Sequence, residues 1–332
     1  MSTSSSPSRS GALLPAPWAV AALLLATSSW GSLFLVGKQV IGVLDPAWFT
    51  LIRYALATAL LALLVQRFGD APWRKLRRHW WRVSLLGVCG YGLFSLLVFY
   101  GLRLSQPSHG SVIMATMPFT TLALRWALDG QRPALRALLA AALAIAGVAT
   151  VADLFGQHGV FSTATLIGDA LALAGTLGWV IYTRGAASLP EHSPLEYTAL
   201  TAVGVLPWLT LGTLAATALG WCPAPSPAAV AAVAPQLLYI AVLPTVAAAL
   251  AFNLGVRRLG APAGTLFLNM VPVSVIAVRA VLGHAPQANE LIGTALVGLA
   301  LALNAWPARS AGADRRPAAA KPAAPLASGV NS

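Results

Sequence analysis

Long apolar runs recur along this chain from Trp18 to Trp306, and they restrict its fold more than any other feature of the sequence. Many of them approach the roughly 20 residues that an α-helix needs to cross a bilayer. Only 9% of the residues are charged and 58% are hydrophobic, whereas soluble domains carry about 25% charged residues. A soluble fold of this length could not cover its surface with so few charges. The sequence therefore predicts an all-α polytopic membrane protein.

Ten apolar ranges are predicted to be transmembrane helices. A bilayer core offers the backbone no hydrogen-bond partners, so only helices or closed barrels can span it, and these runs lack the two-residue alternation of barrel strands. The ranges are 17–37, 46–66, 81–103, 108–128, 134–153, 165–186, 195–218, 230–254, 262–282 and 289–306. The polar residues 1–16 and the Ala- and Pro-rich residues 307–332 are expected to be disordered cytoplasmic tails.

The positions of the basic residues predict the orientation, because cytoplasmic loops of membrane proteins are enriched in Lys and Arg. With a cytoplasmic N-terminus, most of the 21 Lys and Arg residues lie on the inner side. The exceptions are Lys38, Arg103 and Arg279 on the outer side and Arg53 within a span. We therefore expect a multi-pass protein of the inner cell membrane with both termini cytoplasmic. The net charge of +12 follows from this topology, so membrane lipids are expected partners and nucleic acid is not.

One phrase of sequence occurs twice. GSVIMATMPFTTLALR at 110–125 and GTLFLNMVPVSVIAVR at 264–279 share glycine, proline, alanine and arginine in register. Five predicted spans lie in 17–153 and five in 165–306, and an odd number in each half places the two copies in opposite orientations. Many secondary transporters consist of such inverted repeats, with the substrate site near the bilayer midplane. The sequence therefore predicts ten transmembrane helices arranged as two inverted five-helix repeats.

A proline stands in the middle of each copy of the phrase. Pro118 and Pro272 are expected to weaken their helices at mid-depth, where neighbouring groups can satisfy the freed carbonyls. Each is either a packing kink or a hinge that lines a central cavity, and their recurrence in both halves favours the second interpretation.

Several of these features together resemble the EamA branch of the drug/metabolite transporter superfamily. They are Trp30–Gly31, the arginine in FTLIRYALA (49–57), the two proline–arginine motifs, LIGDALALAGTLGWVIYTR (166–184) and LIGTALVGLALALN (291–304). The resemblance implies two tandem five-helix domains and transport, often export, of small metabolites. The family usually has Gly-Glu after the fourth and ninth helices, where this chain has Gln131 and His284. A role that needs the charge of that glutamate does not carry over.

Arg53 is the first candidate for a substrate-binding residue. A charged side chain at mid-membrane costs about 2.5–3.5 kcal/mol on insertion scales, so Arg53 should face protein or water rather than lipid. Either its guanidinium binds an anionic group such as a carboxylate, or it is an internal strut bonded to backbone carbonyls. The resemblance favours the strut, because family members with different substrates share this arginine.

Aromatic and amide side chains complete the candidate substrate site. Trp30, Trp179 and Tyr182 occur at matching depths of the first and sixth predicted spans, where they either line a cavity or anchor the helices at the bilayer interface. Asn253 and Asn269 are further candidates, or amides that join helices to one another. Weaker candidates are Tyr91 and Tyr100.

The predicted function is alternating-access transport, with export the favoured direction, of a small organic metabolite such as an amino acid. Asp169 and His109 lie near the outer ends of their spans and no acid lies clearly at mid-depth, so proton antiport, exchange and facilitated diffusion all stay open. No metal-ligand spacing or catalytic constellation is visible, so we expect no metal, no cofactor and no enzyme activity, in a monomer or homodimer. A membrane-embedded enzyme or a lipid flippase subunit is the alternative.

Overall fold

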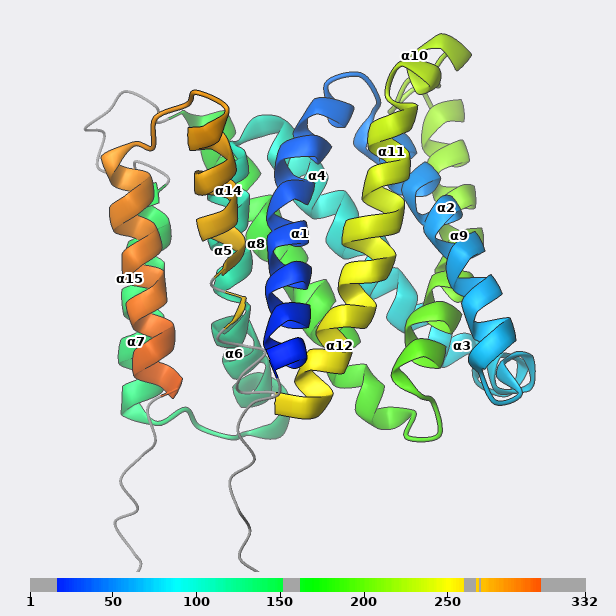
Figure 1. Ribbon diagram of the computed structural model, residues 1–332, viewed down its shortest axis with the longest axis horizontal. Coiled ribbons are helices and arrows are strands. Elements are labelled where there is room, and N and C mark those ends of the chain that lie inside the picture. The colour runs from blue at the N-terminus through cyan, green and yellow to red at the C-terminus, as the bar shows by residue number, and fades with distance from the viewer. Residues whose placement is uncertain (1–16, 152–161, 260–266, 269, 306–332) are drawn as a thin grey trace, which may run out of the picture.

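The computed structural model describes residues 17–151, 162–259, 267–268 and 270–305, which form helices joined by short loops and contain no strand (Figure 1). This confirms the all-α prediction. Six helical segments are long and apolar enough to cross a membrane, and a seventh arises if the bent pair Pro107–Ala115 and Met117–Asp129 is one span. The chain is therefore a polytopic membrane protein. The two predicted tails lie outside the described residues.

Helix occupies part or all of each of the ten predicted ranges. The helices are α1 (Pro17–Ile41), α2 (Pro46–Phe68), α3 (Pro72–Gly87), α4 (Phe94–Leu104), α5 (Pro107–Ala115), α6 (Met117–Asp129), α7 (Leu135–Val151), α8 (Thr163–Gly185), α9 (Pro194–Ala218), α10 (Pro227–Ala232), α11 (Ala234–Ile240), α12 (Ala248–Leu259), α14 (Met270–Val281) and α15 (Ala288–Ala305). Three of these, α7, α14 and α15, are shorter apolar helices, so the number of crossings stays a prediction.

Two spans contain a wider helical segment in their middle. The π-helix η1 (Val88–Leu93) joins α3 to α4, and the π-helix η3 (Ala241–Ala247) joins α11 to α12. In a π-helix each backbone N–H reaches one residue further than in an α-helix, and such segments are rare. Each of these two spans is therefore locally irregular about halfway along its length.

Helix starts follow from local sequence. Asp45 precedes the proline that opens α2, and its side chain accepts a hydrogen bond from the Ala47 N–H at 2.9 Å. Ser193 and Glu196 form a reciprocal capping box at the start of α9. Both arrangements satisfy backbone N–H groups that a helix cannot pair internally, and a proline in the first turn needs no such partner.

The helices run between two ends of the molecule (Figure 1). The Asp45 end, uppermost in Figure 1, carries the loops 42–45, 105–106, 219–226 and 282–287. The Lys75 end carries the loops 69–71, 130–134 and 186–193, and both the start of α1 and the end of α15 lie there.

The helix packing divides into a centre and two sides (Figure 1). On one side α7 packs against α15, and on the other α2 packs against α9. In the centre α1 packs against α12 and α14, while α8 packs against α4, α5 and α6. The main packing partners of the two central helices, α1 and α8, therefore belong to the other half of the chain.

Glycines allow α4 and α8 to approach closely. A Cβ atom at Gly101 would lie 2.4 Å from the carbonyl oxygen of Gly168, and one at Gly168 would lie 2.5 Å from the carbonyl oxygen of Gly101. Small residues at such crossings let helix backbones pack in a membrane, where lipid removes the hydrophobic drive for association. This contact joins the two halves of the chain.

We expect Gly101→Ala to lower the stability of the purified protein by about 1–3 kcal/mol, because the added methyl group must force α4 and α8 apart. Gly212→Ala in α9 is the matched control, since nothing lies within 4 Å of its added Cβ, and alanine is the better helix former. Thermal unfolding in detergent measures both. Equal or higher stability of Gly101→Ala would contradict the close approach.

Candidate functional site

An aromatic cluster lies at the centre of the molecule, where α1, α4, α8 and α12 meet. The rings of Trp30 and Trp179 are in edge contact with centroids 6.5 Å apart. Trp30 also contacts Phe252 at 5.0 Å, and Trp179 contacts Phe94 at 5.3 Å. The structure thus brings together two of the sequence-predicted residues, Trp30 and Trp179, at the contact between α1 and α8.

Tyrosines extend this cluster toward α2 and α9. Tyr182, the third predicted aromatic residue, lies 5.2 Å from Trp179 and 5.0 Å from Tyr91 between ring centroids. The hydroxyls of Tyr91 and Tyr182 are 2.7 Å apart, and Tyr197 packs on Tyr182 at 4.9 Å. We call the group of Trp30, Tyr54, Tyr91, Phe94, Trp179, Tyr182, Tyr197 and Phe252 the aromatic cluster. Buried tyrosine hydroxyls need partners: Tyr91 and Tyr182 supply them to each other, the Tyr197 hydroxyl donates to the Tyr182 carbonyl at 2.5 Å, and the Tyr54 hydroxyl lies 3.2 Å from that of Ser95.

Arg53 lies beside the aromatic cluster with only 2% of its surface exposed. Its Nη2 donates to the Ser95 hydroxyl at 2.6 Å. Its guanidinium carbon lies 4.4 Å from the Tyr54 ring centroid and 5.1 Å from that of Phe99, within the range of cation–π attraction. Among the described residues no acidic side chain pairs with Arg53, and its Nε has no hydrogen-bond partner.

The surroundings of Arg53 bear on both sequence-based interpretations. The side chain faces protein, as predicted, but its partners are a hydroxyl and aromatic rings rather than the backbone carbonyls expected for a strut. The described residues provide no hydrogen-bond acceptor for the Nε of Arg53 and no negative charge to balance its guanidinium. An anionic ligand would supply both.

The other predicted site residues are less informative. Asn253 lies on α12 and is partly exposed, and Asn269 lies outside the described residues. Of the weaker candidates, Tyr91 lies in the aromatic cluster, while the Tyr100 hydroxyl donates to Asp45 at 2.7 Å at the Asp45 end. Sequence reasoning missed Tyr54, Phe94, Tyr197 and Phe252, because aromatic side chains in an apolar run give no separate signal.

The predicted helix weakening at Pro118 is present. The axes of α5 and α6 differ by 47°, and the break falls at Thr116. Proline removes a backbone donor and its ring clashes with the carbonyl four residues earlier, so the helix breaks on its N-terminal side. Pro272 is buried in the first turn of α14. Whether either proline acts as a hinge stays a prediction.

At the Lys75 end a charged group joins α3 to α9. The Glu196 carboxylate accepts from Lys75 Nζ at 2.8 and 3.0 Å. It also accepts from the backbone N–H groups of Asp70 at 2.9 Å and Ser193 at 2.7 Å. Glu196 is 2% exposed, so its carboxylate is a buried contact between the two halves of the chain.

Two histidines lie beside this group. His79 Nε2 is 2.6 Å from the Glu191 carboxylate, and the rings of His79 and His192 are 5.6 Å apart. Neither nitrogen of the buried His192 ring has a hydrogen-bond partner among the described residues, and its Nδ1 lies 4.0 Å from the Glu191 carboxylate. Burial lowers the pKa of His192, because the charged imidazolium loses its hydration, and the nearby Glu191 carboxylate opposes this only in part.

At the Asp45 end the structure pairs two residues that the sequence placed near the ends of separate spans. His109 Nδ1 lies 3.0 Å from an Asp169 carboxylate oxygen, and the Ser105 hydroxyl donates to the other oxygen. His109 is 3% and Asp169 7% exposed. The pair joins α5 to α8.

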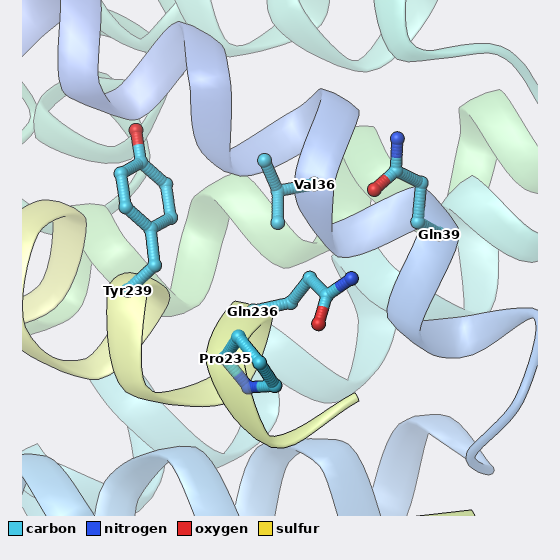
Figure 2. Close-up of a pocket in the computed structure, with 5 residues that line it drawn as sticks. All are labelled: Val36, Gln39, Pro235, Gln236 and Tyr239. Carbon is cyan, nitrogen blue, oxygen red and sulfur yellow. The ribbon is translucent and has the colours of Figure 1, made fainter. Parts of the chain in front are cut away.

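A cavity of about 280 Å³ opens between α1 and α11 near the Asp45 end (Figure 2). Its lining residues are Val36 and Gln39 from α1 and Pro235, Gln236 and Tyr239 from α11. The cavity is open at the surface, and its lining contains none of the predicted site residues. The aromatic cluster and Arg53 therefore do not line this cavity.

Comparisons with known proteins identify transporters. Residues 17–152 match the EamA-like transporter family. The uncharacterized transporter YrdR of Bacillus subtilis (strain 168) is 30% identical over 286 residues, which is 85% of this chain and 89% of the relative. A probable terminal-alkyne amino-acid exporter of Streptantibioticus cattleyicolor is 28% identical over 84% of this chain and 90% of that protein. One solved crystal structure shares the fold, with a TM-score of 0.62 and 20% identity over 86% of this chain and 96% of that one.

The buried His192 predicts an acid-sensitive stability. Its folded pKa lies below the unfolded value of about 6.5, so the folded state binds this proton more weakly than the unfolded state. Stability is therefore lost as the pH falls below about 6.5 toward the folded pKa. We expect His192→Phe to flatten the melting temperature between pH 7.5 and 5.5. His284→Gln, at an exposed position, is the control, and an unchanged acid decline in His192→Phe would contradict the prediction.

Proposed function

This chain belongs to the EamA-like transporter family, and we propose that it carries a small organic metabolite with a carboxylate group across the inner cell membrane by alternating access. Export is the proposed direction. The apolar rings of the aromatic cluster contact the rest of the solute in this proposal, and Arg53 binds its carboxylate.

The observation that carries the proposal is the buried guanidinium of Arg53. Desolvating a charge is costly unless an opposite charge or strong hydrogen bonds compensate it, and the described surroundings offer one hydroxyl and three rings. A substrate carboxylate satisfies the free Nε and the countercharge together. The S. cattleyicolor relative, named a probable amino-acid exporter, supports a carboxylate-bearing solute.

Two features support the proposed inverted repeats, 17–153 and 165–306. Exchanging the halves converts the contacts of α1 with α12 and α14 into those of α8 with α4, α5 and α6. The π-helices η1 and η3 also correspond, within one residue, under the spacing that relates 110–125 to 264–279. Repeats of this kind exchange inward- and outward-facing conformations around a central site.

Polar pairs at both ends of the molecule fit such an exchange. Lys75 with Glu196 joins the first half to the second at the Lys75 end, and His109 with Asp169 does so at the Asp45 end. Alternating access requires each end to separate while the other stays closed. In the proposed topology the Asp45 end is outer, the Lys75 end is cytoplasmic, and Pro118 and Pro272 are the hinges.

The Arg53 proposal is tested by transport. Metabolite profiling of cells with and without the protein selects carboxylate solutes, whose uptake is then measured in proteoliposomes. Arg53→Lys keeps the charge but loses the paired donors of the guanidinium. We expect it to weaken apparent affinity about tenfold or more, since a charged hydrogen bond contributes about 1.5–3 kcal/mol.

The controls separate binding from support. Arg184→Gln, at an exposed arginine paired with Asp129, should transport normally. If Arg53→Lys transports normally while Arg53→Gln only lowers the melting temperature, with or without solute, Arg53 is a strut. Lipid movement without solute transport would favour the flippase alternative.

Orientation has its own test. Reporter fusions after Ser332 and within the outer loop 219–226 should give cytoplasmic and external signals, respectively, because most Lys and Arg residues then lie inside. A fusion after residue 131 in the loop 130–134 should also be cytoplasmic. An external C-terminus would overturn the inverted arrangement of the two repeats.

A further inference from the structure

One buried carboxylate differs from the others in its partner. Four acidic side chains are buried in the described part of the chain. Three pair with bases that stay charged near neutral pH: Asp45 with Arg103, Glu196 with Lys75, and Glu290 with Arg279. The fourth, Asp169, pairs with His109, and histidine is the residue type that ordinarily changes charge between pH 5 and 8. Among the described residues, Asp169 is therefore the buried carboxylate whose basic partner belongs to a residue type that changes charge near neutral pH.

Burial favours one of the two protonation states of this pair. With a neutral imidazole the pair carries one negative charge, and with an added proton its net charge is zero. Enclosing an uncompensated charge among apolar helices is far more costly than enclosing a neutral pair. The closed arrangement, in which His109 and Asp169 are almost fully buried, therefore binds one proton more readily than an arrangement open to water.

The surrounding charges do not replace this proton. From α1, Lys38 donates to the carbonyls of Leu102, Arg103 and Ser105 at the turn between α4 and α5. From α14, Arg279 bonds Ser108 of α5 and the Glu290 carboxylate of α15. On α4, Arg103 and Tyr100 both bond Asp45. The charged residues of α6 and α7, Arg125, Asp129 and Arg136, lie toward the Lys75 end.

The pair has no counterpart in the other half of the sequence. The spacing that relates 101–110 to 255–264 matches His109 with Ala263, and the spacing that relates 28–38 to 176–186 matches Asp169 with Ala21. Neither alanine can bind a proton. A site of this kind is therefore specific to the Asp45 end.

We propose that His109 and Asp169 form a proton-binding site that holds the outer end of the transporter closed when it is protonated. Closing this end takes up one proton from the outside, and losing that proton releases α5 from α8. The proposal rests on the proposed alternating access and orientation, but it does not depend on which solute Arg53 binds.

The test follows the opening of the outer end with a cysteine. Ser111→Cys, on α5 and fully buried, is placed in a background with Cys89→Ser and Cys222→Ser, and its labelling by a membrane-impermeant maleimide is measured from pH 5.5 to 8.5. Ala224→Cys in the exposed loop at the same end corrects for the pH dependence of the reagent. One linked proton changes the closed-to-open ratio by up to tenfold per pH unit, so corrected labelling should fall as the pH falls.

Variants of the pair give opposite outcomes. In Asp169→Asn the imidazole must be neutral to be buried, so labelling should now rise as the pH falls. In His109→Gln the carboxyl must itself be protonated, so the wild-type direction should persist with its midpoint at lower pH. Asp45→Asn keeps an amide at the matched outer pair and should leave the wild-type profile unchanged.

The result that overturns the proposal is pH-independent labelling of the wild-type background, which needs no variant to fold. The same profile in Asp169→Asn as in the wild type, or a reversed profile in Asp45→Asn, would also overturn it. Arg53→Gln in the same background should keep the wild-type pH profile even if transport is lost. Failure of the Arg53 proposal is thereby distinguished from failure of the proton site.

Discussion

A polar group within a membrane span of this protein can find a partner only in the protein, in bound water or in a bound ligand, because the hydrocarbon of a bilayer offers none. Serine and threonine hydroxyls meet this constraint by donating to carbonyls of their own helix, as Thr27 and Thr201 do at 2.8 and 2.6 Å. Buried carboxylates meet it with basic side chains from other helices. The positions of the charged pairs therefore decide which helices are tied together at each end.

The same constraint explains how the chain tolerates irregular helix at its centre. Pro244 in η3 lacks the backbone N–H that would bond the Ile240 carbonyl, four residues earlier, in an α-helix. The Thr245 hydroxyl donates to that carbonyl at 2.8 Å, and the Trp30 indole donates to the carbonyl of Pro244 at 3.0 Å. A tryptophan of the aromatic cluster thus bonds directly to the irregular segment. Movement of α1 against η3 must break or replace this bond, which couples the central cluster to the shape of the span.

Sequence reasoning predicted most of what a single helix determines. The apolar runs located the helices, and Pro118 located the break between α5 and α6. The free-energy cost of placing a charge within a membrane span predicted that Arg53 faces protein. These inferences need only the residue and its distance along one helix, so they do not depend on how the helices pack.

Contacts between helices were beyond the sequence. Asp169 and His109 were each noted at the end of a span, but their pairing depends on the rotation of α5 and α8 about their axes. Ser95 is 42 residues from Arg53 along the chain, and nothing in its sequence neighbourhood marks it as a partner. The π-helix η1 contains no proline, so the sequence gave no signal that predicts its irregular geometry. A single sequence indicates where a helix lies along the chain more directly than how that helix is rotated about its axis.

Helix α8 connects the pair of His109 and Asp169 at the Asp45 end to the aromatic cluster at the centre. Asp169 lies in its first turns, Trp179 and Tyr182 bring it into the aromatic cluster, and Arg184 in its last turn pairs with Asp129 of α6 at 2.6 Å. The Arg184 pair is largely exposed, and such pairs contribute about 0–1 kcal/mol. Breaking the buried Asp169 pair leaves an uncompensated charge, which costs several times more. Of the two charged pairs that join α8 to the first half of the chain, the one at the Asp45 end therefore contributes more. In the proposed mechanism, loss of the proton from His109 and Asp169 weakens this stronger pair.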